Sequence, residues 1–180
     1  ITRWREDPAR DDWGMMFYIA NLNSNNYWSA AYQPVCTEPD EYKVVFQPDQ
    51  VTYSRKDGNI ETKMEVVVSP EFNGEVRSIS LTNHSGSGRM IEITSYFEVV
   101  LYPHAADLAH PAFANLFVHT EYISETNVIL ANRRPKSSDD KSLWLFHTLI
   151  TDGEAVGSIQ YETDRSKFIG RNRNLRNPQV

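Results

Sequence analysis

Cysteine, long apolar runs and clustered positive charge are all scarce in this sequence. The single cysteine, Cys36, excludes an internal disulfide and a cysteine-based metal site, and it favours a reducing compartment such as the cytoplasm. No apolar run approaches the roughly 20 residues that a membrane-spanning helix needs. The net charge of -6 would repel phosphate backbones, so we expect no nucleic-acid partner.

Motifs of the common catalytic sites are also missing. The sequence contains no P-loop, no G-x-G-x-x-G, no H-E-x-x-H and no G-x-S-x-G. His104, Asp107 and His110 form an H-x-x-D-x-x-H pattern, but on a helix this spacing spreads the side chains around the axis instead of converging them on a metal ion. We therefore predict no catalytic residue, no metal site and no cofactor.

Hydrophobic alternation with a period of two is what the sequence does have, and it predicts β-strands. The clearest run is 89–102, "RMIEITSYFEVVLY". We expect it to form the longest strand, with Ile93, Phe97 and Val99 pointing inward. The segment 60–69, "IETKMEVVVS", alternates in the same way.

Turn signals separate these runs. Asp57-Gly58 predicts a hairpin with a tight primed turn. The only helical suggestion is Pro103–Phe113, where Pro103 could start a short helix and Pro111 would end it. Many strands at regular spacing predict an all-β, antiparallel β-sandwich with little helix, in a single domain over residues 1–180. Other turn signals lie at 22–26 and 83–89, and further strands are expected at 116–123, 127–131, 143–150 and 157–161.

Two large aromatic residues lie in "NNYWSAAYQPV". If Tyr27–Gln33 is extended, Trp28 and Tyr32 share one face, which suits either a sugar ring or the inside of a sheet. A hairpin built on 22–26 would bring Trp28 against residues 15–19. We expect Trp28 to be mostly buried there.

Several longer motifs resemble one known family. They are "TRWREDPARDDWG" at 2–14, "WSAAYQP" at 28–34, "DGNIET" at 57–62, "ITSYFEVVL" at 93–101 and "AHPAFANLFV" at 109–118. They are similar to the N-terminal-type β-sandwich of the glycoside phosphorylase family of cellobiose and chitobiose phosphorylases, which includes the cyclic β-1,2-glucan synthases. The resemblance implies a galactose-mutarotase-like super-sandwich, a truncated copy within a much larger synthase.

The resemblance implies that the parent protein is a membrane-anchored synthase. This synthase resembles a glucosyltransferase that uses UDP-glucose, and it also has a phosphorylase-like part. The catalytic carboxylate of the phosphorylases lies in a helical barrel that this chain lacks. The resemblance therefore implies a soluble fragment that serves as a non-catalytic carbohydrate-binding or scaffolding domain, at the cytoplasmic face of the bacterial inner membrane. Its expected partners are β-1,2-glucan or another glucan chain, other domains of the synthase, and further copies through uncovered sheet edges.

Two alternatives stay open: an autonomous carbohydrate-active hydrolase or lyase, and a purely structural interaction domain. If the domain binds sugar, the best candidates are polar and aromatic residues that a packed interior would not select. The arginines and aspartates among them could equally pair with each other. The candidate carbohydrate-binding residues are Arg3, Trp4, Arg5, Asp11, Asp12, Trp13 and Gln33.

Overall fold

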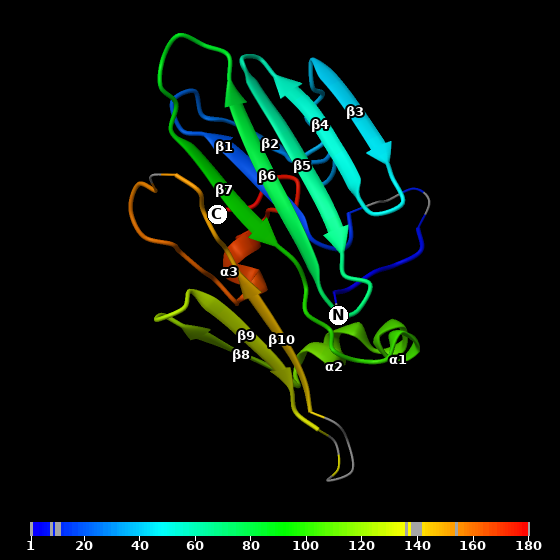
Figure 1. The fold of residues 1–180 in the computed structure, drawn as a ribbon. Coiled ribbons are helices and arrows are strands. Elements are labelled where there is room, and N and C mark those ends of the chain that lie inside the picture. Colours follow the sequence, from blue (N-terminus) through cyan, green and yellow to red (C-terminus); the bar gives the residue numbers. More distant parts are fainter. Residues whose placement is uncertain are drawn as a thin grey trace. The chain divides into compact units, whose positions relative to one another are not determined.

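The computed structural model describes residues 2–7, 9, 12–135, 137, 142–153 and 155–179 (Figure 1). It divides into two compact units. Asp7–Tyr96 with Arg173–Asn177 form what we call the sandwich unit. Ile1–Glu6, Phe97–Asn172 and Pro178–Val180 form the mixed unit. The prediction of one single domain stays a prediction.

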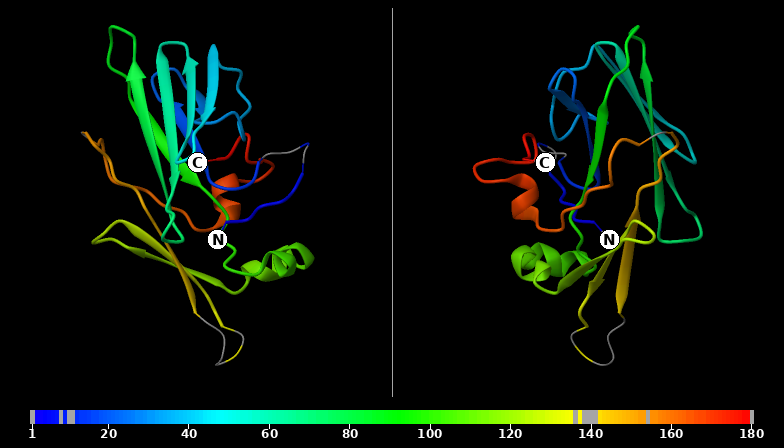
Figure 2. Two further views of the ribbon diagram at one scale, coloured as in Figure 1. Left: turned by 45° about the vertical axis from the view of Figure 1, so that its right-hand side comes forward. Right: turned by 90° about the vertical axis from the view of Figure 1, so that its left-hand side faces the viewer.

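The sandwich unit consists of two antiparallel sheets that lie face to face (Figure 2). One sheet has the strand order β2-β1-β7 and the other β3-β4-β5-β6. The strands are β1 (Met16–Asn21), β2 (Asn26–Ser29), β3 (Glu41–Phe46), β4 (Val51–Asp57), β5 (Ile60–Val68), β6 (Glu75–Asn83) and β7 (Ile91–Tyr96).

Alternating residues of both sheets fill the space between them. Phe17, Ile19 and Trp28 come from β1 and β2, while Ile60 and Met64 come from β5, and all five are buried. Period-two alternation places such residues on one face of each strand, so the two apolar faces meet as a core. The period-two pattern therefore predicted this unit's packing correctly.

Two predicted hairpins are present. Asp57 pairs with Ile60 across a two-residue turn, and Gly58 has φ +60°. Glycine adopts positive φ without steric cost, which makes it the usual residue at the first central position of a primed turn. Asn21 pairs with Asn26 around the loop 22–25, which confirms the hairpin predicted from "LNSNN".

In its described residues, the mixed unit has three short helices and one three-stranded sheet of order β10-β9-β8. Ala131 and Arg133 on β9 are buried, so one face of this sheet is packed. The Arg133 guanidinium lies 3.9 Å from the centre of the Tyr102 ring, and it donates a hydrogen bond to the Ala114 carbonyl. The elements are α1 (His104–Ala109), α2 (Pro111–Asn115), β8 (Val118–Ile123), β9 (Val128–Arg133), β10 (Leu143–Thr148) and α3 (Arg165–Ile169).

The all-β, antiparallel class is confirmed. Strands account for about 40% of the structure, against roughly 20–25% in an average soluble protein. The described helices have five or six residues each. Among the residues that the structure describes, no helix is both long and apolar enough to cross a membrane.

The prediction for 89–102 was correct for Ile91–Tyr96, which form β7 with Ile93 packed against the core, but it was wrong about the length of the strand. β7 ends at Tyr96, and the longest strands are β5 and β6 with nine residues each. Val99 forms only an isolated bridge with Thr2. Val100 and Leu101 are both buried and Leu101 has φ 48°, so the backbone leaves the extended conformation that alternation requires.

The short helix expected after Pro103 is present as α1, and it ends before Pro111. Pro111 then begins α2, because proline is tolerated in the first helical turn, where the missing N–H has no intrahelical partner. Two smaller expectations need correction. Residues 157–161, all of them described, form no strand. β2 ends at Ser29, so Tyr32 lies beyond the strand and is 38% exposed instead of sharing a strand face with Trp28.

Candidate functional site: a polar pocket at the hairpin end

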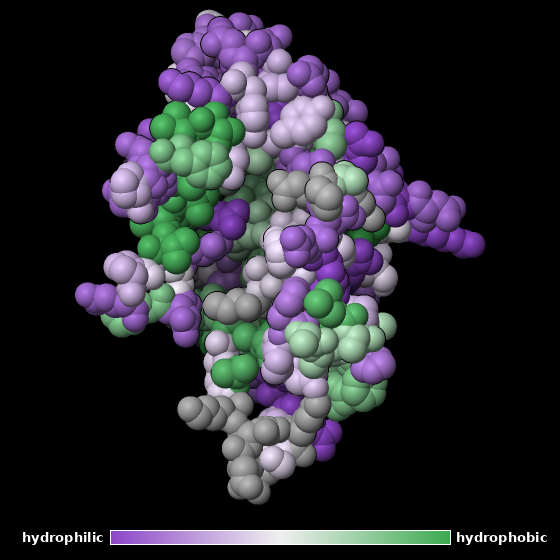
Figure 3. All heavy atoms as spheres, turned by 90° about the vertical axis from the view of Figure 1, so that its right-hand side faces the viewer, coloured by the Kyte–Doolittle hydropathy of each residue, from purple (hydrophilic) through white to green (hydrophobic). Residues whose placement is uncertain are grey.

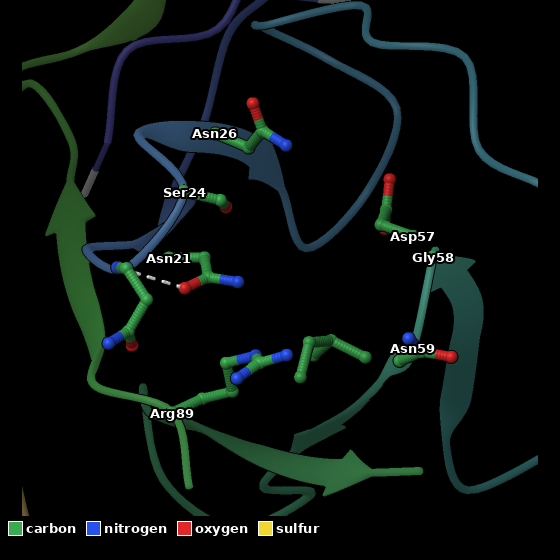
Figure 4. A pocket seen from close by; sticks show the side chains of 9 residues that line it. Asn21, Ser24, Asn26, Asp57, Gly58, Asn59 and Arg89 are labelled. Carbon is green, nitrogen blue, oxygen red and sulfur yellow. Dashed lines mark hydrogen bonds between the residues drawn. The ribbon is translucent and has the colours of Figure 1, made fainter. Parts of the chain in front are cut away.

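A cavity of about 300 Å³ lies at one end of the sandwich unit (Figure 4). The β1–β2 loop, the β4–β5 turn and the segment before β7 meet around it. β1, β4 and β6 all run toward this end and β2, β5 and β7 run away from it, because neighbouring strands are antiparallel. The lining residues are Asn21, Asn23, Ser24, Asn26, Asp57, Gly58, Asn59, Ile60 and Arg89.

Asparagine side chains hold the loops around the cavity. Asn21 Oδ1 accepts a hydrogen bond from the Asn23 amide N–H at 3.1 Å, and Asn23 Oδ1 accepts one from the Met90 N–H at 2.7 Å. The first bond holds the β1–β2 loop, and the second joins this loop to the segment before β7. The Asn21 Nδ2 group points into the pocket, with the Arg89 guanidinium beside it (Figure 4).

The opposite wall is fixed by a buried ion pair. Arg55, only 1% exposed, donates from Nε and Nη2 to the two carboxylate oxygens of Asp57, at 2.7 and 2.6 Å. Its remaining donors bind the carbonyl oxygens of Ser29, Ala31 and Thr37. Arg55 thus neutralises Asp57 and anchors the β4–β5 turn at the wall of the pocket.

This lining is suited to a neutral ligand with many hydroxyl groups. Of the nine described lining residues, Ile60 alone has an apolar side chain. Amides both donate and accept hydrogen bonds and guanidinium only donates, so the pocket offers both kinds of group. The polar groups of these residues are therefore available to bind a ligand, while the aliphatic parts of the lining can contact its C–H groups.

The sequence-predicted site residues lie elsewhere. Arg3 is 7% exposed, and its guanidinium binds Glu98, Asp107 and Asn115. Arg5 donates to Asp107 at 2.8 Å. The two arginines thus pair with carboxylates far away in the sequence, Asp107 and Glu98. Pairing of arginine with Asp11 or Asp12 stays a prediction.

Asp107 is the centre of this cluster in the mixed unit. Burial raises the pKa of its carboxyl, but hydrogen bonds and positive charge from Arg3 and Arg5 outweigh burial, and the net pKa lies below the ordinary value of 3.8. Asp107 therefore stays ionised at neutral pH. Its two carboxylate oxygens accept hydrogen bonds from Arg3 and Arg5, and the absence of a metal ion at His104, Asp107 and His110 stays a prediction.

The other predicted residues are spread over both units. Trp4 is 53% exposed, and its ring lies 5.8 Å from that of His104 in the mixed unit. Asp12, Trp13 and Gln33 are half-buried and belong to the sandwich unit. The Gln33 side-chain oxygen accepts a hydrogen bond from Cys36. Asp11 lies outside the described residues, and a sugar contact by any of the seven stays a prediction.

None of the pocket residues was singled out from the sequence as a binding residue. Their signal was present, because the turn motifs at 22–26, 57–58 and 83–89 contain six of the nine lining positions, and Asn21 and Asn59 are direct neighbours of these motifs. Those motifs were interpreted only as turns. Convergence of the turns depends on strand pairing, above all on β1 with β7.

The fold places the chain among antiparallel β-sandwich proteins. The family model "Glycosyl hydrolase 94, supersandwich domain" matches residues 1–180, so the chain belongs to this family. It is 30% identical over 175 residues to cyclic beta-(1,2)-glucan synthase NdvB of Rhizobium meliloti (strain 1021), which covers 97% of this chain and 6% of the synthase.

Two phosphorylases are also similar. Solabiose phosphorylase of Paenibacillus borealis is 26% identical, covering 86% of this chain and 19% of the enzyme. N,N'-diacetylchitobiose phosphorylase of Vibrio furnissii is 24% identical, covering 99% of this chain and 22% of the enzyme. The chain therefore spans less than a quarter of the length of each of these relatives. The family resemblance read from the motifs is confirmed.

Proposed function

We propose that this chain is a non-catalytic carbohydrate-binding domain of a cyclic β-1,2-glucan synthase, and that the polar pocket holds part of the glucan. The observation that carries this proposal is the amide-rich lining at the hairpin end, with one guanidinium and a neutralised carboxylate. A glucan chain presents neutral hydroxyl groups, which such a lining can bind without placing a charge against another charge. The similarity to cyclic beta-(1,2)-glucan synthase NdvB suggests the ligand class.

A non-catalytic role fits the chemistry of the pocket. Glycoside hydrolysis needs two carboxyl groups that face each other across the sugar, roughly 5 to 10 Å apart. Asp57 is the one carboxylate among the described lining residues, and Arg55 holds both of its oxygens. This favours binding over the alternative of an autonomous hydrolase or lyase.

A titration with linear β-1,2-gluco-oligosaccharides of several lengths tests the proposal, read by protein NMR. We expect Asn26→Ala to weaken binding about threefold to tenfold and Arg89→Gln about tenfold or more, since a hydrogen bond contributes about 1 kcal/mol and one from a charged group somewhat more. Both side chains are exposed, so stability should change little. Arg171→Gln removes an equally exposed arginine of the mixed unit and serves as the control.

Unchanged affinity in both pocket variants would move the binding site elsewhere. If the folded chain binds none of these oligosaccharides, the alternative of a purely structural interaction domain is favoured. Turnover of UDP-glucose, or of β-1,2-glucan with phosphate, that copurifies with this polypeptide would contradict the non-catalytic role.

We also propose that the parent synthase carries this domain at the cytoplasmic face of the inner membrane, where the domain contacts other parts of the synthase. Sheet edges are candidates for such contacts or for self-association. β3 is an edge strand whose Val45 and Phe46 are 36% and 76% exposed. Figure 3 shows hydrophobic atoms gathered on this side of the sandwich unit.

A further inference from the structure

The sheet of the mixed unit exposes two large aromatic side chains on one face. Trp144 and Phe146 on β10 are 59% and 74% exposed. They are two residues apart in a strand, so both point to the same side of the sheet. Their attachment points are about 6.7 Å apart, because a strand rises about 3.4 Å per residue.

Trp144 and Phe146 lie on the face of the β8–β10 sheet that is opposite its packed face. Trp144 pairs with Asn132 and Phe146 with Leu130, whereas the buried Ala131 and Arg133 alternate with those partners on β9. Ala131 and Arg133 therefore point to the inner side, where Arg133 covers the Tyr102 ring. The mixed unit has already built its core on that side, and Trp144 and Phe146 are not part of it.

Polar side chains share the outer face with the two aromatics. Across the sheet, His119 on β8 lies opposite Asn132, and Glu121 lies opposite Leu130. His119 and Glu121 are exposed. A face made to dock on another protein's core would be depleted of charge at its centre, whereas here an imidazole, a carboxylate and an amide lie in the same rows as the rings.

We propose that this outer face of β8–β10 is a second glucan-binding surface, on which sugar rings stack against Trp144 and Phe146. A sugar ring offers an apolar C–H face to an aromatic ring and its hydroxyl groups to neighbouring polar side chains. Asn132, His119 and Glu121 are placed to bind those hydroxyl groups. The ligand class rests on the proposed function, but the surface itself belongs to the other unit and shares no residue with the pocket.

A flat aromatic surface and a small pocket should differ in the ligand length they require. Two rings on one strand contact consecutive parts of a chain, so stacking should add affinity only for longer oligosaccharides. The pocket, at about 300 Å³, should contribute equally to short and long ligands. Ligand length therefore separates the two sites.

The test titrates the chain with linear β-1,2-gluco-oligosaccharides, comparing the disaccharide with chains of six or more glucose units, by calorimetry. For the double variant Trp144→Ala/Phe146→Ala we expect at least about tenfold weaker binding of the long chains and an unchanged affinity for the disaccharide. Phe72→Ala removes an aromatic ring of similar exposure, 73%, in the sandwich unit and should change neither affinity. The thermal midpoint of the double variant should stay within about 2 °C of the original.

Three results would overturn the proposal. If the double variant binds long chains as well as the original does, while Arg89→Gln still weakens binding, the aromatic surface is not a sugar site and the proposed function stands. If the unchanged chain binds neither ligand, the proposed function fails and this inference fails with it. If the double variant instead changes the sedimentation coefficient or loses stability, the face is a protein interface.

Discussion

Replacement of Trp28 by alanine should be among the most damaging changes in the sandwich unit. The indole is 3% exposed and packs in the core with Phe17, Ile19 and Met64. Truncation of a buried Trp or Phe costs about 3 to 5 kcal/mol, because the lost transfer free energy is joined by the energy of the cavity that remains.

A hydrogen bond adds to this cost. The Trp28 Nε1–H donates to the hydroxyl oxygen of Thr62 at 3.1 Å, and Thr62 is fully buried. Without the indole, that hydroxyl loses a partner inside the core, which costs about 1 to 3 kcal/mol. We therefore expect Trp28→Ala to lower the free energy of unfolding by about 4 to 8 kcal/mol.

Urea unfolding followed by far-ultraviolet circular dichroism measures this loss of stability. Two control variants separate the contribution of the hydrogen bond from that of core packing. Thr62→Val keeps the core filled but leaves the buried indole N–H of Trp28 without its acceptor, so it should cost about 1 to 3 kcal/mol. Trp28→Phe keeps a ring in the core and should fall between the two, and it supplies the measurement if the alanine variant does not fold. A loss below about 1 kcal/mol for Trp28→Ala would refute the placement of this indole in the core.

Two further changes test the ion-pair cluster and the primed turn. Asp107→Asn leaves Arg3 and Arg5 without their shared carboxylate and should cost about 3 kcal/mol in thermal or urea unfolding. Because the folded-state pKa of Asp107 is lowered from 3.8, its contribution is complete at neutral pH and is lost as the pH falls below about 4. Stability curves of the original and Asn variants that stay parallel through this acid range would contradict that assignment. Gly58→Ala should lower the free energy of unfolding by about 1 kcal/mol, because φ is +60° at this position. The control is Gly74→Ala, where the space is open and φ is not positive, and it should change stability little. Equal losses of stability in the two variants would argue against the turn geometry at Gly58.

Local patterns explain how much of the fold the sequence predicts. Period-two alternation correctly placed β5, and Asp57-Gly58 correctly placed the turn before it. Both signals depend only on neighbouring residues. The strand predicted over 89–102 is correct only as far as Tyr96. The alternation continues in the sequence after Tyr96, but there the chain passes into the mixed unit, where side chains pack against different partners.

The ion-pair partners of the charged residues near the start of the chain could not be predicted from local sequence either. Arg3 and Arg5 were grouped with Asp11 and Asp12 because they are close in sequence. Their carboxylate partner in the structure is Asp107, about a hundred positions away in the chain. Ion pairing was the right kind of interaction, but no local pattern identifies the partner.

The pocket was harder to predict for a chemical reason as well. Asparagine, aspartate, serine and glycine favour turns because short polar side chains bind the nearby backbone, or because glycine tolerates positive φ. The same amides and carboxylates are the groups that bind hydroxyl groups of a sugar. Asn21 has both roles, since its Oδ1 holds the β1–β2 loop while its Nδ2 points into the cavity. A sequence shows the first role in every such turn, and only the pairing of β1 with β7 and of β4 with β5 brings these turns together as a binding site.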